Sequence, residues 1–215
     1  MASNVHFIGV TILALTIPIA ANAGMGKYEE PLTNHPKYIE ANAQLEAKDY
    51  SNALNSFDLL LKIFKNSAGS YYGRAKAYHE QDKSTNAFND YSRSLEINQN
   101  NPKALNNRAL IYGSKGDFKS AISDLNKAIN MNPNYDHAFL NRGVAKGANG
   151  DPKGAINDFS TAISINPLYA KAWRNRGITK EMFGDIKGAC IDWKRAANLG
   201  IEDCQDWVKS QCSAQ

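Results

Sequence analysis

Residue types that could carry out chemistry are few and widely separated in this sequence. His35, His79 and His137 stand far apart, and none is spaced from another His or from a Cys as metal ligands are. No glycine-rich phosphate loop follows a strand-like segment, and no Ser/His/Asp or Cys/His arrangement is evident. We therefore predict a protein that is not an enzyme and that holds no metal and no cofactor.

A second set of side chains is suited to holding a polypeptide. Asparagine recurs at a regular 34-residue interval, as Asn107, Asn141 and Asn175. A side-chain amide donates to a carbonyl group and accepts from an N–H group, so it can hold a main chain without reading its sequence. A basic or titratable residue stands four positions before each asparagine, and an arginine precedes the last one: Lys103, His137, Lys171 and Arg174.

These seven positions have two interpretations. In the first, they form a basic groove that binds a protein or an extended peptide, with a preference for acidic or C-terminal segments. In the second, the asparagines and the charged groups face water on exposed helix turns. We take the first interpretation as the predicted partner-binding site and keep the second as its alternative.

The three cysteines of the chain are Cys190, Cys204 and Cys212. Cys204 and Cys212 lie eight positions apart on one expected helix, about 12 Å along its axis, which is too far for a bond. If the last two helices run antiparallel about Gly200, Cys190 and Cys212 are the better-matched pair. We predict a Cys190–Cys212 disulfide with Cys204 buried, and three free thiols are the alternative.

The elements that must position these residues follow a strict period. Ala53, Ala87, Ala121, Ala155 and Ala189 recur at an unbroken 34-residue spacing. Large or small apolar residues mostly occupy the positions four and seven after each alanine, which places a stripe on one helical face, and a second stripe begins sixteen positions before the alanine in four units. Glycine followed by aspartate separates the two stripes in three units, as at a helix end followed by a helix cap. The pattern predicts an all-α protein of repeated helix pairs.

This period, the two helices per unit and the prolines Pro102, Pro133 and Pro167 near the unit ends resemble tetratricopeptide (TPR) repeats. The resemblance covers residues 34–200 in five units and implies a right-handed superhelix, or solenoid. It also implies that the first helix of each unit lines a concave groove, where the three asparagines would form a ladder that holds an extended peptide.

The same resemblance organises the rest of the chain. Residues 24–33 are expected to be a flexible leader, and the divergent first unit, residues 34–67, fits an atypical terminal repeat. Residues 201–215 are expected to form a capping helix and a tail, with the helix over 201–211, because the last repeat would otherwise leave its apolar face open.

Four of the five units carry an arginine thirteen positions before the periodic alanine and an aspartate three positions after it, and the first unit has neither. This joint presence and absence predicts that each arginine pairs with its aspartate across the helix pair, since a partly buried arginine needs a partner. The alternative is an arginine ladder for anionic ligands. The predicted pairs are Arg74–Asp90, Arg108–Asp124, Arg142–Asp158 and Arg176–Asp192.

The segment 1–23 contains no Lys, Arg, Asp or Glu. Its apolar run, residues 7–21, is too short to cross a bilayer comfortably, which takes about 20 apolar residues. The segment ends in Ala21-Asn22-Ala23, the small-x-small pattern that signal peptidase accepts. We predict a signal peptide cleaved after Ala23 and export to the periplasm, the thylakoid lumen or the medium, with no membrane span in the mature chain. An uncleaved anchor is the alternative.

Composition agrees with a soluble globular protein, with 43% hydrophobic and 21% charged residues. The net charge of +4 is mild and no basic run is present, so no nucleic-acid partner is expected. The sequence does not predict the oligomeric state.

As a whole, the chain resembles small exported TPR proteins of bacteria, including cyanobacteria. We predict a non-catalytic scaffold for protein–protein interaction that helps to assemble an envelope or membrane complex. The alternatives are a helical-repeat RNA-binding protein, whose repeats are usually one residue longer, and an accessory subunit of an enzyme.

Overall fold

The computed structural model describes residues 32–212, and over this part of the chain it contains helices and no strands. The all-α prediction is confirmed for these residues. After a short 3-10 turn at Leu32–Asn34, the α-helices are α1 (Pro36–Glu46), α2 (Tyr50–Ile63), α3 (Ala68–Glu80), α4 (Ser84–Ile97), α5 (Pro102–Ser114), α6 (Phe118–Met131), α7 (Asp136–Ala148), α8 (Pro152–Ile165), α9 (Ala170–Met182), α10 (Ile186–Asn198) and α11 (Glu202–Gln211).

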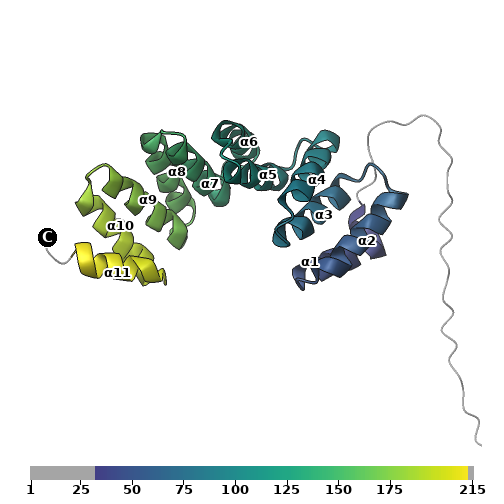
Figure 1. The fold of residues 1–215 in the computed structure, drawn as a ribbon, viewed down its shortest axis with the longest axis horizontal. Helices are drawn as coiled ribbons and strands as arrows, with labels where there is room; N and C mark the ends of the chain where they lie inside the picture. Colours follow the sequence, from purple (N-terminus) through teal and green to yellow (C-terminus); the bar gives the residue numbers. More distant parts are fainter. Residues whose placement is uncertain (1–31, 213–215) are drawn as a thin grey trace, which may run out of the picture.

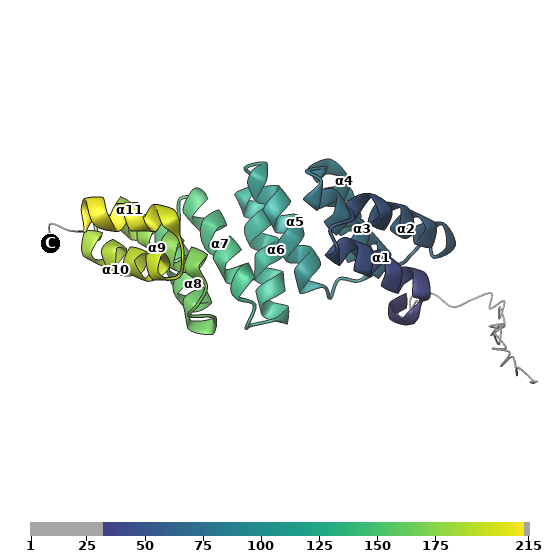
Figure 2. The same cartoon turned by 90° about the horizontal axis from the view of Figure 1, so that it is seen from below.

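Consecutive helices form five pairs, α1 with α2 through α9 with α10, and the pairs stack into an arch (Figure 1). Each pair also packs on the next, through α2 with α3 and its counterparts along the chain. The odd-numbered helices contact one another as well, α1 with α3, α5 with α7 and α7 with α9, so they line the inner, concave side. The view turned by 90° shows the pairs following one another along the long axis of the molecule (Figure 2). The described residues thus form an all-α repeat superhelix.

The tight turn inside each pair explains where the helices end. Gly116, Gly150 and Gly184 have φ angles of +77°, +85° and +78°, in the left-handed region that glycine enters without strain. The aspartate that follows each glycine then caps the next helix; Asp117, for example, accepts from the N–H of Ser120 at 3.1 Å. In the first two units Lys48 and Asp82 take the same left-handed conformation, with φ of +61° and +58°.

Small residues let the two helices of a pair come close together. A Cβ atom added to Gly143 on α7 would lie 2.6 Å from the ring of Phe159 on α8. A Cβ added to Gly177 on α9 would lie 2.5 Å from the indole of Trp193 on α10. These distances are shorter than any van der Waals contact, so the aromatic ring that follows the periodic alanine packs directly on the backbone of the odd-numbered helix.

The four predicted arginine–aspartate pairs are confirmed. In each, the Nε and Nη2 atoms of the arginine donate to the two carboxylate oxygens of the aspartate at 2.7–2.9 Å, the bidentate geometry of a strong ion pair. The aspartates are buried, and the side chain of Asp192 is only 1% exposed. A lysine joins two of the pairs: Lys146 lies 2.9 Å from Asp158, and Lys180 lies 2.9 Å from Asp192.

A third contact, which the sequence did not indicate, joins each arginine to the preceding unit. The Nη1 atom of the arginine donates to a side chain sixteen positions earlier, on the previous even-numbered helix. We call the arginine, its aspartate and this acceptor an arginine clamp, and each clamp ties three helices together. The acceptors are Asp58 at 2.6 Å from Arg74, Ser92 at 3.3 Å from Arg108, Asn126 at 2.7 Å from Arg142 and Ser160 at 3.0 Å from Arg176.

The C-terminal end of the array is closed by α11, the expected capping helix. A disulfide of 1.99 Å joins Cys190 on α10 to Cys212 just after α11, the pairing favoured from the sequence, and the thiol of Cys204 is buried. Trp207 packs on Trp193 with 5.2 Å between ring centroids. The outer residues of α11 are mostly polar and exposed, so this helix presents a hydrated surface at the end of the stack.

Some predictions concern residues that the structure does not describe. The signal peptide over residues 1–23 and residues 24–31 of the leader lie outside the described range, as do residues 213–215 of the tail. Within residues 32–212, none of the helices combines the length and the apolar character that crossing a membrane requires.

Candidate functional site

An apolar row lies on the concave side of the array. Leu110, Val144 and Ile178 occupy the same place on α5, α7 and α9, one repeat period apart. Leu110 is 42% and Val144 is 48% exposed, although neighbouring apolar positions on the same helices are buried. We call these three residues the apolar row.

Two neighbouring hollows follow the apolar row. The smaller, about 180 Å³, lies between α5 and α7, and Leu110, Asn141 and Val144 are among its lining residues. The larger, about 660 Å³, lies between α7 and α9, where Val144, Asn175 and Ile178 help to line it. Because Val144 lines both, the hollows adjoin along the groove. The larger one has the volume of a small-molecule or side-chain pocket.

The larger hollow exists because α7 carries little side-chain bulk there. Gly147 and Ala148, beside Gly143, line one wall and leave space that longer side chains would fill. On the opposite wall, at the end of α9, Met182 is 74% exposed and Phe183 is 62% exposed. Large apolar groups exposed around a concavity mark a surface that another molecule can cover.

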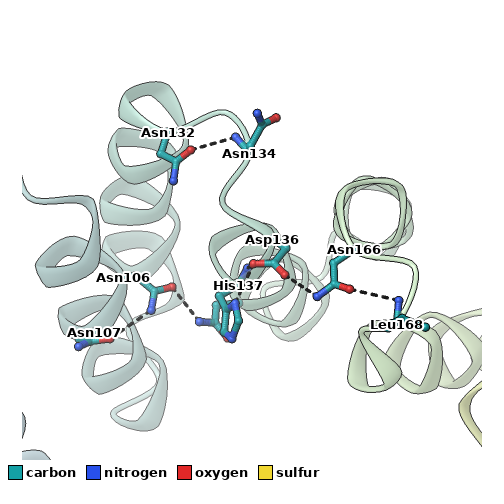
Figure 3. A network of polar contacts seen from close by, with 9 residues as sticks. Asn106, Asn107, Asn132, Asn134, Asp136, His137, Asn166 and Leu168 are labelled. Atoms are coloured by element: carbon teal, nitrogen blue, oxygen red, sulfur yellow. Dashed lines mark hydrogen bonds and ion pairs between the residues drawn. The ribbon is translucent and has the colours of Figure 1, made fainter. Parts of the chain in front are cut away.

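Two of the three predicted ladder asparagines belong to one hydrogen-bonded chain. Asn141 on α7 donates from Nδ2 to the carbonyl oxygen of Asn106 at 2.8 Å. Asn106, which is buried, donates to Asn107 at 3.2 Å (Figure 3), and Asn107 donates to the hydroxyl of Tyr91 at 3.2 Å. Both ends of the Asn107 amide are therefore used inside the protein. The side-chain oxygen Oδ1 of Asn141 has no partner among the described residues.

Asn175 is the more available of the ladder residues. Its side-chain oxygen Oδ1 accepts a long hydrogen bond of 3.4 Å from Nη1 of Arg174, and its side-chain nitrogen Nδ2 has no partner within residues 32–212. It lies in the wall of the larger hollow. Asn141 and Asn175 therefore offer one acceptor and one donor to a ligand in the groove.

His137 is oriented by its neighbours at the start of α7. Its Nδ1 atom lies 2.7 Å from a carboxylate oxygen of Asp136, and the other oxygen of Asp136 accepts from Asn166 at 2.9 Å (Figure 3). The ring also packs on Tyr169 with 4.9 Å between centroids. Burial acts to raise the pKa of Asp136, but the hydrogen bonds from Asn166 and His137 outweigh it and hold the pKa below its usual range. Among residues 32–212, no three His, Cys, Asp or Glu side chains gather as a metal site requires.

The remaining three predicted site residues divide into two groups. Lys103 and Lys171 are exposed at the second residue of α5 and of α9, and neither forms an ion pair with a described residue. Arg174, in contrast, donates from Nε and Nη2 to Asp203 on α11 at 2.8 and 2.6 Å, and its guanidinium lies 5.3 Å from the ring of Trp207. Because residues of α11 already engage its guanidinium group, we leave Arg174 out of the candidate site.

The seven predicted site residues included neither the apolar row nor Met182 and Phe183. A signal for the apolar row was present in the sequence, because Leu110, Val144 and Ile178 follow the repeat period outside both buried stripes. Met182 and Phe183 follow no such period, and only their exposure beside the hollow marks them.

Profiles of a known protein family match two of the helix pairs of the array. Profiles of the tetratricopeptide repeat match residues 68–101 and residues 102–135, which are the pairs α3–α4 and α5–α6 with their connections. The other pairs carry the same 34-residue period. The chain is a tetratricopeptide-repeat protein. No curated protein sequence matches this TPR protein.

Several solved structures share its fold. MamA from Desulfovibrio magneticus RS-1 is 18% identical with a TM-score of 0.70, over 79% of this chain and 95% of that one. PilF of Pseudomonas aeruginosa is 16% identical with a TM-score of 0.72, over 81% and 86%. YrrB, described as a TPR protein with an unusual peptide-binding site, is 20% identical with a TM-score of 0.68, over 81% and 91%. At these identities the likeness concerns the fold of the TPR protein alone.

Proposed function

We propose that this TPR protein is a non-catalytic interaction scaffold that binds an extended segment of another protein along the concave side of α5, α7 and α9. Repeat superhelices present extended concave surfaces of this kind, which bind partners through many modest contacts. The peptide-binding site of YrrB, a protein of similar fold, is in keeping with this proposal.

The observation that carries the proposal is the apolar row with its two adjoining hollows. Leu110, Val144 and Ile178 repeat on three successive odd-numbered helices, so the surface continues along the groove and suits an elongated ligand. The acceptor of Asn141 and the donor of Asn175 lie in the same walls. They are the two groups that a main chain, with its N–H and C=O groups, can satisfy.

A selection from random peptides tests the proposal although the natural partner is unidentified. Residues 24–215 would be immobilised and panned against a library of 12-residue peptides displayed on phage. We expect enriched binders whose affinity falls roughly 100-fold for the Val144→Asp/Ile178→Asp variant, because two carboxylates would be desolvated in the apolar contact.

The matched control is Ile191→Asp, since Ile191 is 66% exposed on α10, away from the apolar row. This variant should retain the binders, and circular dichroism should show all the proteins equally helical. Binders that the groove variant retains, or that Ile191→Asp loses, would move the interface to the convex side and end the proposal.

Two features near the ends of the chain support a more specific role and location for the protein. An exported scaffold that helps to assemble an envelope or membrane complex agrees with the signal-like pattern before Gly24, and a disulfide is typical of proteins outside the cytoplasm. Expressed with its full sequence in a bacterium, the protein should be recovered from the periplasm with Gly24 as its first residue. N-terminal sequencing checks this, and an intact Met1 in the cytoplasmic fraction would contradict it.

A further inference from the structure

The groove has a basic edge as well as the apolar row. Lys103, His137 and Lys171 are the second residues of α5, α7 and α9, and all three are exposed. The two lysines form no ion pair with a described residue. In the middle of the edge, the carboxylate of Asp136 beside His137 is only 17% exposed and is held by His137 and Asn166. The edge is therefore positively charged at both of its ends.

The basic edge and the apolar row contact opposite sides of a ligand that lies in the groove. On each helix the apolar residue follows the basic residue by seven positions, which is about two helical turns, so both lie on the same helical face about 10 Å apart. This arrangement repeats on three helices, and adjacent packed helices lie roughly 8–10 Å apart. A ligand lying along the groove thus has positive charge on one side and apolar surface on the other.

An extended polypeptide matches this arrangement by its geometry. Successive side chains of a strand point to opposite sides, and the chain advances about 3.3 Å per residue, so about eight residues would span α5, α7 and α9. From this charge and shape complementarity we infer that the segment bound in the groove has alternating acidic and apolar residues. The acidic side chains meet Lys103 and Lys171, and the apolar ones enter the two hollows. This inference rests on the function proposed above and specifies the sequence class of the ligand.

Three labelled synthetic peptides of about eight residues test the inference by fluorescence anisotropy. One alternates Glu and Leu, one has the same composition in two blocks, and one alternates Lys and Leu. The alternating Glu/Leu peptide should bind about tenfold tighter than the block peptide and tighter still than the Lys/Leu peptide. The Lys103→Gln/Lys171→Gln variant should bind it about fivefold more weakly and with a smaller salt dependence.

The control variant is Lys127→Gln/Lys194→Gln, which makes the same change in charge on two exposed lysines of α6 and α10. It should bind the Glu/Leu peptide as the wild type does. Equal affinities for the alternating and block peptides, equal effects of the two lysine variants, or no binding of the Glu/Leu peptide would each overturn the inference. Library binders that depend on Val144 and Ile178 would still support the proposed function in those cases, and their absence would end both proposals.

Discussion

The Asp192→Ala variant is expected to unfold about 6–12 °C below the wild type in a thermal melt followed by circular dichroism. Asp192 is the most buried carboxylate of the four arginine clamps, and it lies within 2.9 Å of both Arg176 and Lys180. Removing it leaves two cations without their main partner in a largely dry environment. Breaking such a pair costs about 3 kcal/mol or more, and 1 kcal/mol shifts the melting temperature of a chain of this size by about 2–4 °C.

Two further variants test whether the clamp is the cause. Asp206 on α11 is 82% exposed, so Asp206→Ala should change stability by less than about 0.5 kcal/mol. Adding Arg176→Ala to Asp192→Ala should recover part of the loss, because the uncompensated guanidinium is then absent. A melting temperature of Asp192→Ala within about 2 °C of the wild type would show that the clamps contribute little.

The Cys190→Ser/Cys212→Ser variant should lose about 3 kcal/mol of unfolding free energy. The disulfide joins residues 22 positions apart, and closing a loop of this size removes conformational entropy from the unfolded chain. The loss should begin at the C-terminal end, because the bond connects α11 to α10. Trypsin should therefore cut after Lys209 in the variant under conditions in which it leaves the wild type intact.

A thiol count provides the control for this experiment. Burial raises the pKa of Cys204 to about 12, so its thiol should not react with a thiol reagent at pH 8 until the protein is unfolded. The unfolded wild type should then show one thiol and no more. Three reactive thiols, or equal proteolysis of the wild type and the variant, would show that the bond does not form or does not hold α11.

The repeat geometry could be predicted from the sequence because the same residue spacing recurs in every unit. The alanines at 34-residue intervals fix the helix pairs, and the joint presence of Arg108 and Asp124 in one unit, with both absent from the first, identifies a contact. The backward contact from Arg108 to Ser92 escaped prediction because its acceptor changes from unit to unit. A periodic place occupied by different polar residues gives no pattern.

The groove was only partly predictable because it depends on contacts outside the period. Arg174 was expected in the site, but Asp203, 29 positions later on the capping helix, pairs with it. Asn107 was expected to offer its amide to a ligand, but its oxygen accepts from the buried Asn106, which has no counterpart in the other units, and its nitrogen donates to Tyr91. The larger hollow arises from missing bulk on α7, which is visible only when α9 is set against it.

The arginine clamps also make the units interchangeable. The atoms that meet at each junction are a guanidinium from one unit and an oxygen sixteen positions earlier, whether that oxygen belongs to an aspartate, an asparagine or a serine. If residues 102–135 were deleted, Arg142 would stand sixteen positions after Ser92 and could close the new junction as Arg108 does now. Duplication of a unit would preserve the junctions in the same way. The length of the array can therefore change by whole units, in evolution or by design, and the span of the segment that it accommodates would change in the same steps.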